Sequence, residues 1–145
     1  MKKYILAHDL GTTGNKATLY DSDGVLVGSA FYGYGTEYAH PNWAEQNPED
    51  WWRAVCASTQ ALLQQTKIRP AEVAAVTFSG QMMGAVPLDR AARPLRNAII
   101  WADQRAVPQE RWLGERIDPA EVYRITGHRL SASYSLSKIL WLRDN

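Results

Sequence analysis

The chain has 145 residues, of which 46% are apolar and 21% are charged, and its formal net charge is +1. This composition suits one globular domain with a buried core, and the near-zero charge gives no electrostatic reason to expect nucleic acid or an anionic membrane as partner. No apolar run approaches the roughly 20 residues that span a bilayer, and the apolar run before His8 is too short for a signal peptide. Because the single cysteine, Cys56, cannot form an internal disulfide, we expect a cytoplasmic protein.

Strand-forming residues dominate the first part of the chain. Apolar runs at 4–7 and 17–20 flank a Gly- and Thr-rich connection, and a turn at 21–24 precedes an extended segment that reaches about residue 32. This order predicts a three-stranded meander. A helix should then begin at Asn47-Pro48 and run to about Gln65. Its buried face is predicted to carry Trp52, Val55, Cys56, Thr59, Leu62 and Leu63.

Strands and helices alternate in the remainder. A buried strand is predicted at 73–78, and two further strands at 85–88 and 97–101 are joined by a turn at 89–94. Helices are predicted at about 107–116, at 118–127 with Asp118 as its cap and Gly127 at its end, and at about 135–143. The pattern indicates an α/β fold.

The connection between the first two predicted strands carries unusual chemistry for a turn. Asp9 ends the first strand, Gly11, Thr12 and Thr13 form the connection, and Lys16 opens the second strand. Glycine lets backbone N–H groups approach a ligand, threonine hydroxyls add donors, and a carboxylate suits Mg²⁺. The connection therefore suits nucleotide phosphates, although the same residues also make ordinary solvated turns.

Two later segments follow predicted strands. Gln81-Met82-Met83 comes after the strand at 73–78, where a ligand could bind at the sheet edge, or the methionines could fill a core. Trp101, Asp103 and Arg105 combine an aromatic face with planar polar groups, a mixture that suits a sugar. The alternative is an Asp–Arg pair at a helix entrance beside a packed tryptophan.

The order Asp9-x-Gly11-Thr12-Thr13-x-x-Lys16 resembles the first phosphate motif of the FGGY carbohydrate kinases, relatives of actin, hexokinase and the 70-kDa chaperones. Further ordered matches, closest to xylulose kinases, run over the whole chain. They are Trp43–Trp52, Ser79-Gly80-Gln81-Met82, Pro94-Leu95-Arg96, Trp101-x-Asp103-x-Arg105, Thr126-Gly127 and Lys138–Leu142.

This resemblance implies an actin-like (RNase H-like) ATPase domain that binds ATP, Mg²⁺ and a small sugar. Asp9 would organise Mg²⁺, and the ATP phosphates would face Gly11, Thr12, Thr13 and Lys16. The substrate would face Gln81, Met82, Met83, Trp101 and Asp103. A homodimer is the expected assembly, with no nucleic acid or membrane partner.

The complete enzyme would phosphorylate a ketopentose such as D-xylulose. One departure points to another ketose or polyol, because xylulose kinases usually place His where this chain has Met83, which cannot donate a hydrogen bond. His8 also departs from the small or aliphatic residue usual before the Asp. Residues 1–145 would be the N-terminal part of the first kinase domain, without its remainder, its catalytic base or the C-terminal domain. This chain alone should be inactive.

Two other classes of function share the predicted fold. A non-catalytic ATP-binding switch of the actin and chaperone type would need no sugar pocket, so Gln81-Met82 and Trp101 argue against it. An RNase H-like nuclease needs several clustered acids, and Asp9 is the only acid well placed for that role.

Overall fold

The computed structural model describes residues 3–145, which form two compact units. The first contains the residues up to Gly35 together with Pro48–Gln81, and the second contains Thr36–Asn47 together with Met82–Asn145. Each unit is therefore built from two separate stretches of chain.

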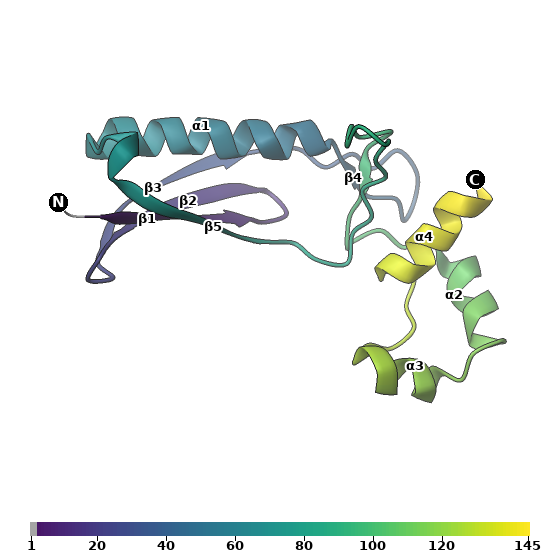
Figure 1. The fold of residues 1–145 in the computed structure, drawn as a ribbon. Helices are drawn as coiled ribbons and strands as arrows, with labels where there is room; N and C mark the ends of the chain where they lie inside the picture. The colour runs from purple at the N-terminus through teal and green to yellow at the C-terminus, as the bar shows by residue number, and fades with distance from the viewer. Residues whose placement is uncertain (1–2) are drawn as a thin grey trace. The chain divides into compact units, whose positions relative to one another are not determined.

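A four-stranded sheet forms the centre of the first unit (Figure 1). Its strands are β1 (Tyr4–Leu10), β2 (Gly14–Asp21), β3 (Leu26–Gly33) and β5 (Val73–Gly80), in the order β3-β2-β1-β5. The first three are antiparallel neighbours, as expected for a meander, whereas β5 lies parallel to β1. The carboxyl ends of β1 and β5 consequently lie side by side.

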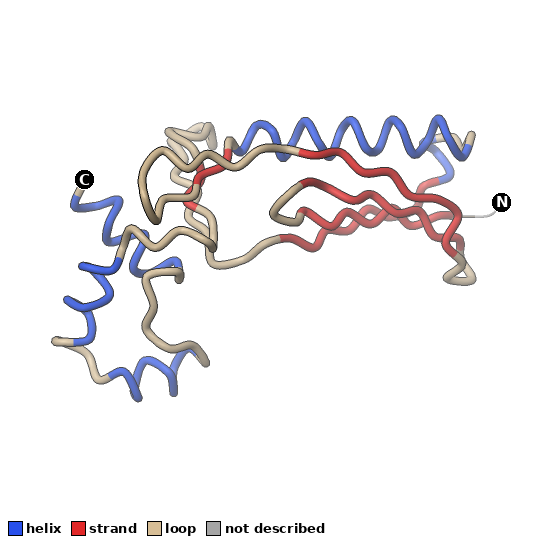
Figure 2. Tube along the Cα trace, turned by 180° about the vertical axis from the view of Figure 1, so that it is seen from behind, coloured by secondary structure: helices blue, strands red, loops and turns tan. Residues whose placement is uncertain are grey.

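Helix α1 (Pro48–Thr66) runs along one face of this sheet, as both ribbon and tube show (Figures 1 and 2). Leu62 of the helix packs with Leu6, Ala17 and Leu19 of β1 and β2 to form the core. Gly28 of β3 permits the close approach, because a Cβ there would lie 2.9 Å from the Thr66 Cγ2 atom. A short 3₁₀ turn, Pro70–Glu72, leads from the helix into β5.

The second unit contains mostly loops and short elements (Figure 2). A two-residue strand, β4 (Glu45–Gln46), pairs with β6 (Ala98–Ile99), and α2 (Val107–Gly114), α3 (Pro119–Thr126) and α4 (Ser135–Asp144) follow. The Asp118 side chain accepts a hydrogen bond from the Ala120 N–H, and Gly127 ends α3 with a φ of 72°. The predicted cap and C-terminal glycine of this helix are therefore confirmed.

The α/β class, the meander and all four predicted helices are confirmed. The strand predicted at 73–78 forms as β5, but it is not buried, because its residues from Ala74 onward are exposed. Two further strand predictions are wrong in extent. Residues 85–88 make only isolated bridges, from Ala85 to Ile99 and from Leu88 to Pro94, and the strand predicted at 97–101 is limited to β6. The predicted buried face of α1 is also shifted. Trp52 is 64% exposed, and the buried positions are Ala54, Val55, Ser58 and Leu62.

Within residues 3–145, no helix has both the length and the apolar composition needed to cross a bilayer.

Candidate functional site

The connection between β1 and β2 is a tight hairpin whose backbone is fixed from two sides. The Gly11 N–H donates to the Gly14 carbonyl oxygen over 3.0 Å and closes the turn. Gly14 is itself packed, because a Cβ at this position would lie 2.3 Å from the Phe31 ring and 2.6 Å from the Tyr32 carbonyl oxygen. The path of the connection is therefore set by its own hydrogen bond and by the neighbouring strand β3.

Tyr34, just beyond β3, is a contributor to this hairpin that sequence reasoning missed. Its hydroxyl donates to the Gly11 carbonyl oxygen over 2.6 Å, and its backbone N–H donates to the Thr13 carbonyl oxygen over 3.2 Å. Burial, and then the nearby Asp9 carboxylate, raise the pKa of Tyr34 to about 12, so the hydroxyl remains a donor at neutral pH. The only sequence signal is the Gly33-Tyr34-Gly35 run, whose two glycines are compatible with a loop or with an irregular strand end.

Asp9 and Lys16 are directly opposite each other in the β1–β2 ladder, and both side chains are exposed. Cross-strand partners point to the same face of a sheet, so a carboxylate and an ammonium flank the hairpin together. In the described part of the chain, no group of three or more His, Cys, Asp or Glu residues could enclose a metal ion. A single exposed carboxylate instead fits Mg²⁺, which usually keeps several waters and takes few protein ligands.

On the opposite face of β1 and β2, His8 and Asn15 are buried beneath α1. The Asn15 Nδ2 atom lies 3.0 Å from the His8 Nδ1 atom and donates to the Ser58 hydroxyl over 2.7 Å. The His8 ring also stacks on Phe78 of β5, with ring centroids 5.1 Å apart. This polar network ties the strand that presents Asp9 to the helix, and it accounts for the unusual histidine before Asp9.

Because of His8, we expect the protein to lose stability as the pH drops below 6.5. Burial lowers the pKa of His8 below its ordinary value of 6.5, and the hydrogen bond with Asn15 offsets this only in part. As the pH falls, His8 therefore takes up a proton in the unfolded chain before it does so in the folded protein. The free energy of unfolding that the neutral buried ring supports above pH 6.5 is then lost, by at most about 1.4 kcal/mol per pH unit.

Urea denaturation followed by circular dichroism at pH 7.5 and at pH 5.5 would measure this effect. A His8→Gln variant should lose much less stability over the same interval than the unmodified protein, and His128→Gln, which replaces an exposed histidine, should retain the original dependence. An unchanged pH dependence in His8→Gln would contradict the assignment.

The structure places the predicted substrate residues at different positions. Gln81 directly follows β5, and its backbone N–H donates to the Leu10 carbonyl oxygen over 2.9 Å, so it belongs to the first unit beside the end of β1. Met82 and Met83 begin the second long stretch of the other unit. Met82 is 72% exposed, so it does not fill a core.

Met82 and Met83 line a mostly apolar cavity of about 430 Å³ within the second unit. The other walls come from α3, from the start of α4 and from the loop between them, with Val122, Leu130 and Tyr134 among the lining residues. Polar groups from Thr126, His128, Arg129 and the nearby serines interrupt the apolar surface. Such a combination suits a small ligand with a few hydrogen-bonding groups.

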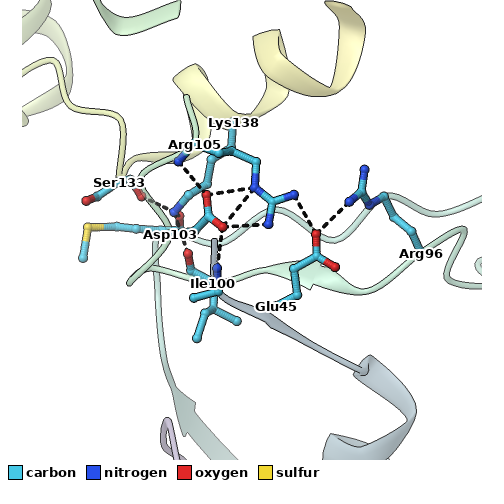
Figure 3. Close-up of polar contacts among 9 residues, drawn as sticks. Glu45, Arg96, Ile100, Asp103, Arg105, Ser133 and Lys138 are labelled. Carbon is cyan, nitrogen blue, oxygen red and sulfur yellow. Dashed lines mark hydrogen bonds and ion pairs between the residues drawn. The ribbon is translucent and has the colours of Figure 1, made fainter. Parts of the chain in front are cut away.

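Asp103 lies in a buried ion cluster, and it is not among the residues that line this cavity. Its carboxylate accepts hydrogen bonds from the Arg105 guanidinium, the shortest over 2.7 Å, and from the Ala44 N–H over 2.6 Å (Figure 3). The same guanidinium pairs with Glu45 of β4 over 2.6 Å, and Arg96 pairs with the same Glu45 oxygen over 2.7 Å. The sequence left open whether Asp103 and Arg105 contact a sugar or pair with each other. The structure shows an ion pair between them, just before α2.

Two tryptophans enclose the Arg105 guanidinium. Its central carbon lies 3.6 Å from the centroid of the Trp43 ring and 4.9 Å from that of Trp141, and these two rings meet edge to face. Trp101, in contrast, is 44% exposed and is not among the residues that line the cavity. The ion cluster thus joins β4, the loop after β6 and α4, while Trp101 remains accessible to a ligand.

The chain is similar in sequence to a family of known enzymes and to individual members of it. The N-terminal domain of the FGGY family of carbohydrate kinases matches residues 4–145. A glycerol kinase from Nostoc sp. is 35% identical over 142 residues, which cover 97% of this chain and 28% of that protein.

Solved structures give the same picture. A ligand-bound xylulose kinase from Lactobacillus acidophilus superposes with a TM-score of 0.89 at 33% identity, over 99% of this chain and 29% of that one. A gluconate kinase from the same organism has a TM-score of 0.87 at 31% identity, over 100% of this chain and 29% of that one. The chain thus spans less than a third of the length of each of these three relatives. It belongs to the FGGY family of carbohydrate kinases, and its match is to the N-terminal domain of that family.

Proposed function

We propose that the complete protein transfers the γ-phosphoryl group of ATP to a hydroxyl of a small sugar or polyol. A ketopentose such as D-xylulose is the leading candidate, and another ketose or a polyol is the alternative. Family membership supports the reaction class, and the names of the relatives, which include glycerol, xylulose and gluconate kinases, support the substrate range. The β1–β2 hairpin is the observation that carries the proposal for the nucleotide.

The hairpin would receive the ATP phosphates. Its backbone is held by the Gly11–Gly14 hydrogen bond and by Tyr34, so Gly11 keeps the path of the connection fixed and the N–H groups and hydroxyls of Thr12 and Thr13 need little reordering on binding. Lys16 would supply positive charge toward the phosphate oxygens. Asp9 would hold Mg²⁺ directly or through its waters, and the bound ion would neutralise charge on the phosphates.

The sugar would meet the cavity of the second unit through Met82 and Met83, whereas Gln81 and Trp101 are predicted substrate residues that do not line this cavity. Met82 and Met83 would present apolar surface to the carbon skeleton, Trp101 would offer a flat ring face, and Gln81 would offer an amide to a hydroxyl. We assign Asp103 an indirect role, because it is fully buried and its carboxylate is bound by Arg105 and Ala44.

Catalysis would also need groups outside residues 1–145. A general base must accept the proton of the sugar hydroxyl, and we assign that role to no residue of this chain. We propose that residues 1–145 are the N-terminal part of the first domain of a two-domain kinase and have no turnover alone. The cytoplasmic location and the homodimer remain predictions.

A substrate screen of the full-length protein tests the proposed function. D-xylulose, other pentuloses, glycerol and gluconate would each be incubated with ATP and Mg²⁺, and ADP release and the phosphorylated product would both be measured. We expect sugar- or polyol-dependent ADP release with matching product for at least one compound. Phosphorylation of none of them would favour the non-catalytic ATP-binding switch instead.

A further inference from the structure

Lys138 of α4 is a buried cation that neither the predicted site nor the ion cluster accounts for. Its side chain has 0% exposure, although lysine is rarely buried completely. The Nζ atom donates to the Met83 carbonyl oxygen over 3.0 Å, to the Ile100 carbonyl oxygen over 2.8 Å, and to the Ser133 carbonyl oxygen (Figure 3). An ammonium has three donors, so all of them are used by backbone carbonyls.

These three carbonyls come from segments that are distant in the sequence and adjoin the proposed sugar-contacting residues. Met83 lines the cavity itself, Ile100 directly precedes Trp101, and Ser133 directly precedes Tyr134, another lining residue. A single ammonium therefore ties together the backbones of three segments, two of which carry residues that line the cavity. No neutral aliphatic side chain could make these contacts.

The backbone conformation of Met83 indicates what the Lys138 ammonium does. Met83 has a φ of 64°, in the left-handed region that residues other than glycine seldom adopt. Such a conformation persists only where the surrounding structure holds it. The bond from Lys138 to the Met83 carbonyl oxygen is a direct means of holding it.

Stability alone is a weak explanation for this lysine. Burial lowers the pKa of Lys138 to about 8, while the Asp103 carboxylate acts in the opposite direction and the Arg105 guanidinium adds to the lowering. The group is thus still charged at neutral pH, and its desolvation opposes folding. Well-packed apolar residues often replace buried charges without loss of stability, which favours a role in shaping the site.

We propose that Lys138 is a positioning residue for substrate recognition, which holds the backbones of Met83, Ile100 and Ser133 in the arrangement that binds the sugar or polyol. This inference rests on the proposed function, because it assumes that the cavity at Met83 receives the substrate. It predicts that loss of the ammonium weakens substrate binding without affecting nucleotide binding.

Steady-state kinetics of the full-length protein provide the test, with the substrate taken from the screen described above. In Lys138→Met, we expect the KM for the sugar or polyol to rise at least tenfold, whereas the KM for ATP and kcat should stay within threefold of the original values. Lys67→Met makes the same substitution at an exposed lysine and should leave all three constants unchanged. An unchanged KM for the sugar, or an equal rise in the KM for ATP, would overturn the proposal.

A second variant links the effect to Met83. Met83→Gly should itself raise the KM for the sugar, because it removes a lining side chain. Glycine adopts positive φ without strain, so Lys138→Met should raise the KM less in the Met83→Gly background than in the original protein. Additive effects would show that Lys138 does not act through the Met83 backbone.

The folding of the variants is checked by circular dichroism. If Lys138→Met does not fold, Lys138→Gln keeps two N–H donors and should give a smaller rise in the same KM. If neither variant folds, Lys138 serves folding alone and the proposal is overturned. Absence of any phosphorylation by the unmodified protein would instead refute the proposed function, so the two failures are distinguishable.

Discussion

Replacing Asp9 by asparagine is expected to lower the kcat of the full-length protein by about 100- to 1000-fold, the usual effect of removing one electrostatic contact to a transition state. Asparagine keeps the size of the side chain but removes its charge, and a neutral amide oxygen is a poorer partner for Mg²⁺ and its waters. The hairpin itself should survive, because the bonds that fix it involve Gly11, Gly14 and Tyr34 and do not involve the Asp9 side chain.

Initial rates at saturating sugar and varied Mg²⁺ and ATP would measure this effect. Asp23→Asn is the matched control, because Asp23 is an exposed aspartate in the turn between β2 and β3, away from the hairpin connection. It should leave kcat unchanged. A kcat for Asp9→Asn within threefold of the original value would contradict the assignment of Asp9 to Mg²⁺.

Replacing Arg105 by methionine is expected to destabilise the second unit by about 3–5 kcal/mol, the cost of breaking a buried charge pair by removing one partner. The Arg105 side chain is 1% exposed and Asp103 is 0% exposed, so water cannot take the place of the guanidinium. Asp103 would keep only the Ala44 N–H and the backbone N–H of residue 105 as donors, and the cation–π contacts of the guanidinium with Trp43 and Trp141 would be lost.

Urea denaturation of the variant would measure this loss of free energy of unfolding. Arg93→Met is the control, because it breaks a salt bridge to Asp89 in which the arginine side chain is 79% exposed, and it should cost less than about 1 kcal/mol. Adding Asp103→Leu to Arg105→Met should recover part of the stability, since the unpaired carboxylate is then removed. A loss below 1 kcal/mol for Arg105→Met would show that the cluster is not stabilised by this pair.

Local signals in the sequence were sufficient for much of the first unit. The turn at 21–24, the alternating strand residues and the start of α1 at Pro48 depend on neighbours a few residues away, and the structure agrees with each. The same holds for Asp118 and Gly127 at the ends of α3. Strand extent depends on distant pairing partners, which explains why the strands predicted at 85–88 and 97–101 are reduced to bridges and to β6.

For the candidate site, the sequence by itself determined which residues carry suitable chemistry, and the ordered motifs determined the family. The hairpin from Asp9 to Lys16 was identified in this way because its members lie within eight consecutive residues. Only the tertiary structure decided how the other polar residues are used. Asp103 is buried against Arg105, Tyr34 reaches back to Gly11, and Lys138 is buried while its neighbours Leu136 and Ile139 are exposed. The burial of Asp103 also depends on the Ala44 N–H, 59 positions away, and the other two outcomes depend on contacts between residues 23 and 55 positions apart or on which helix face is covered. None of these is encoded in a local pattern.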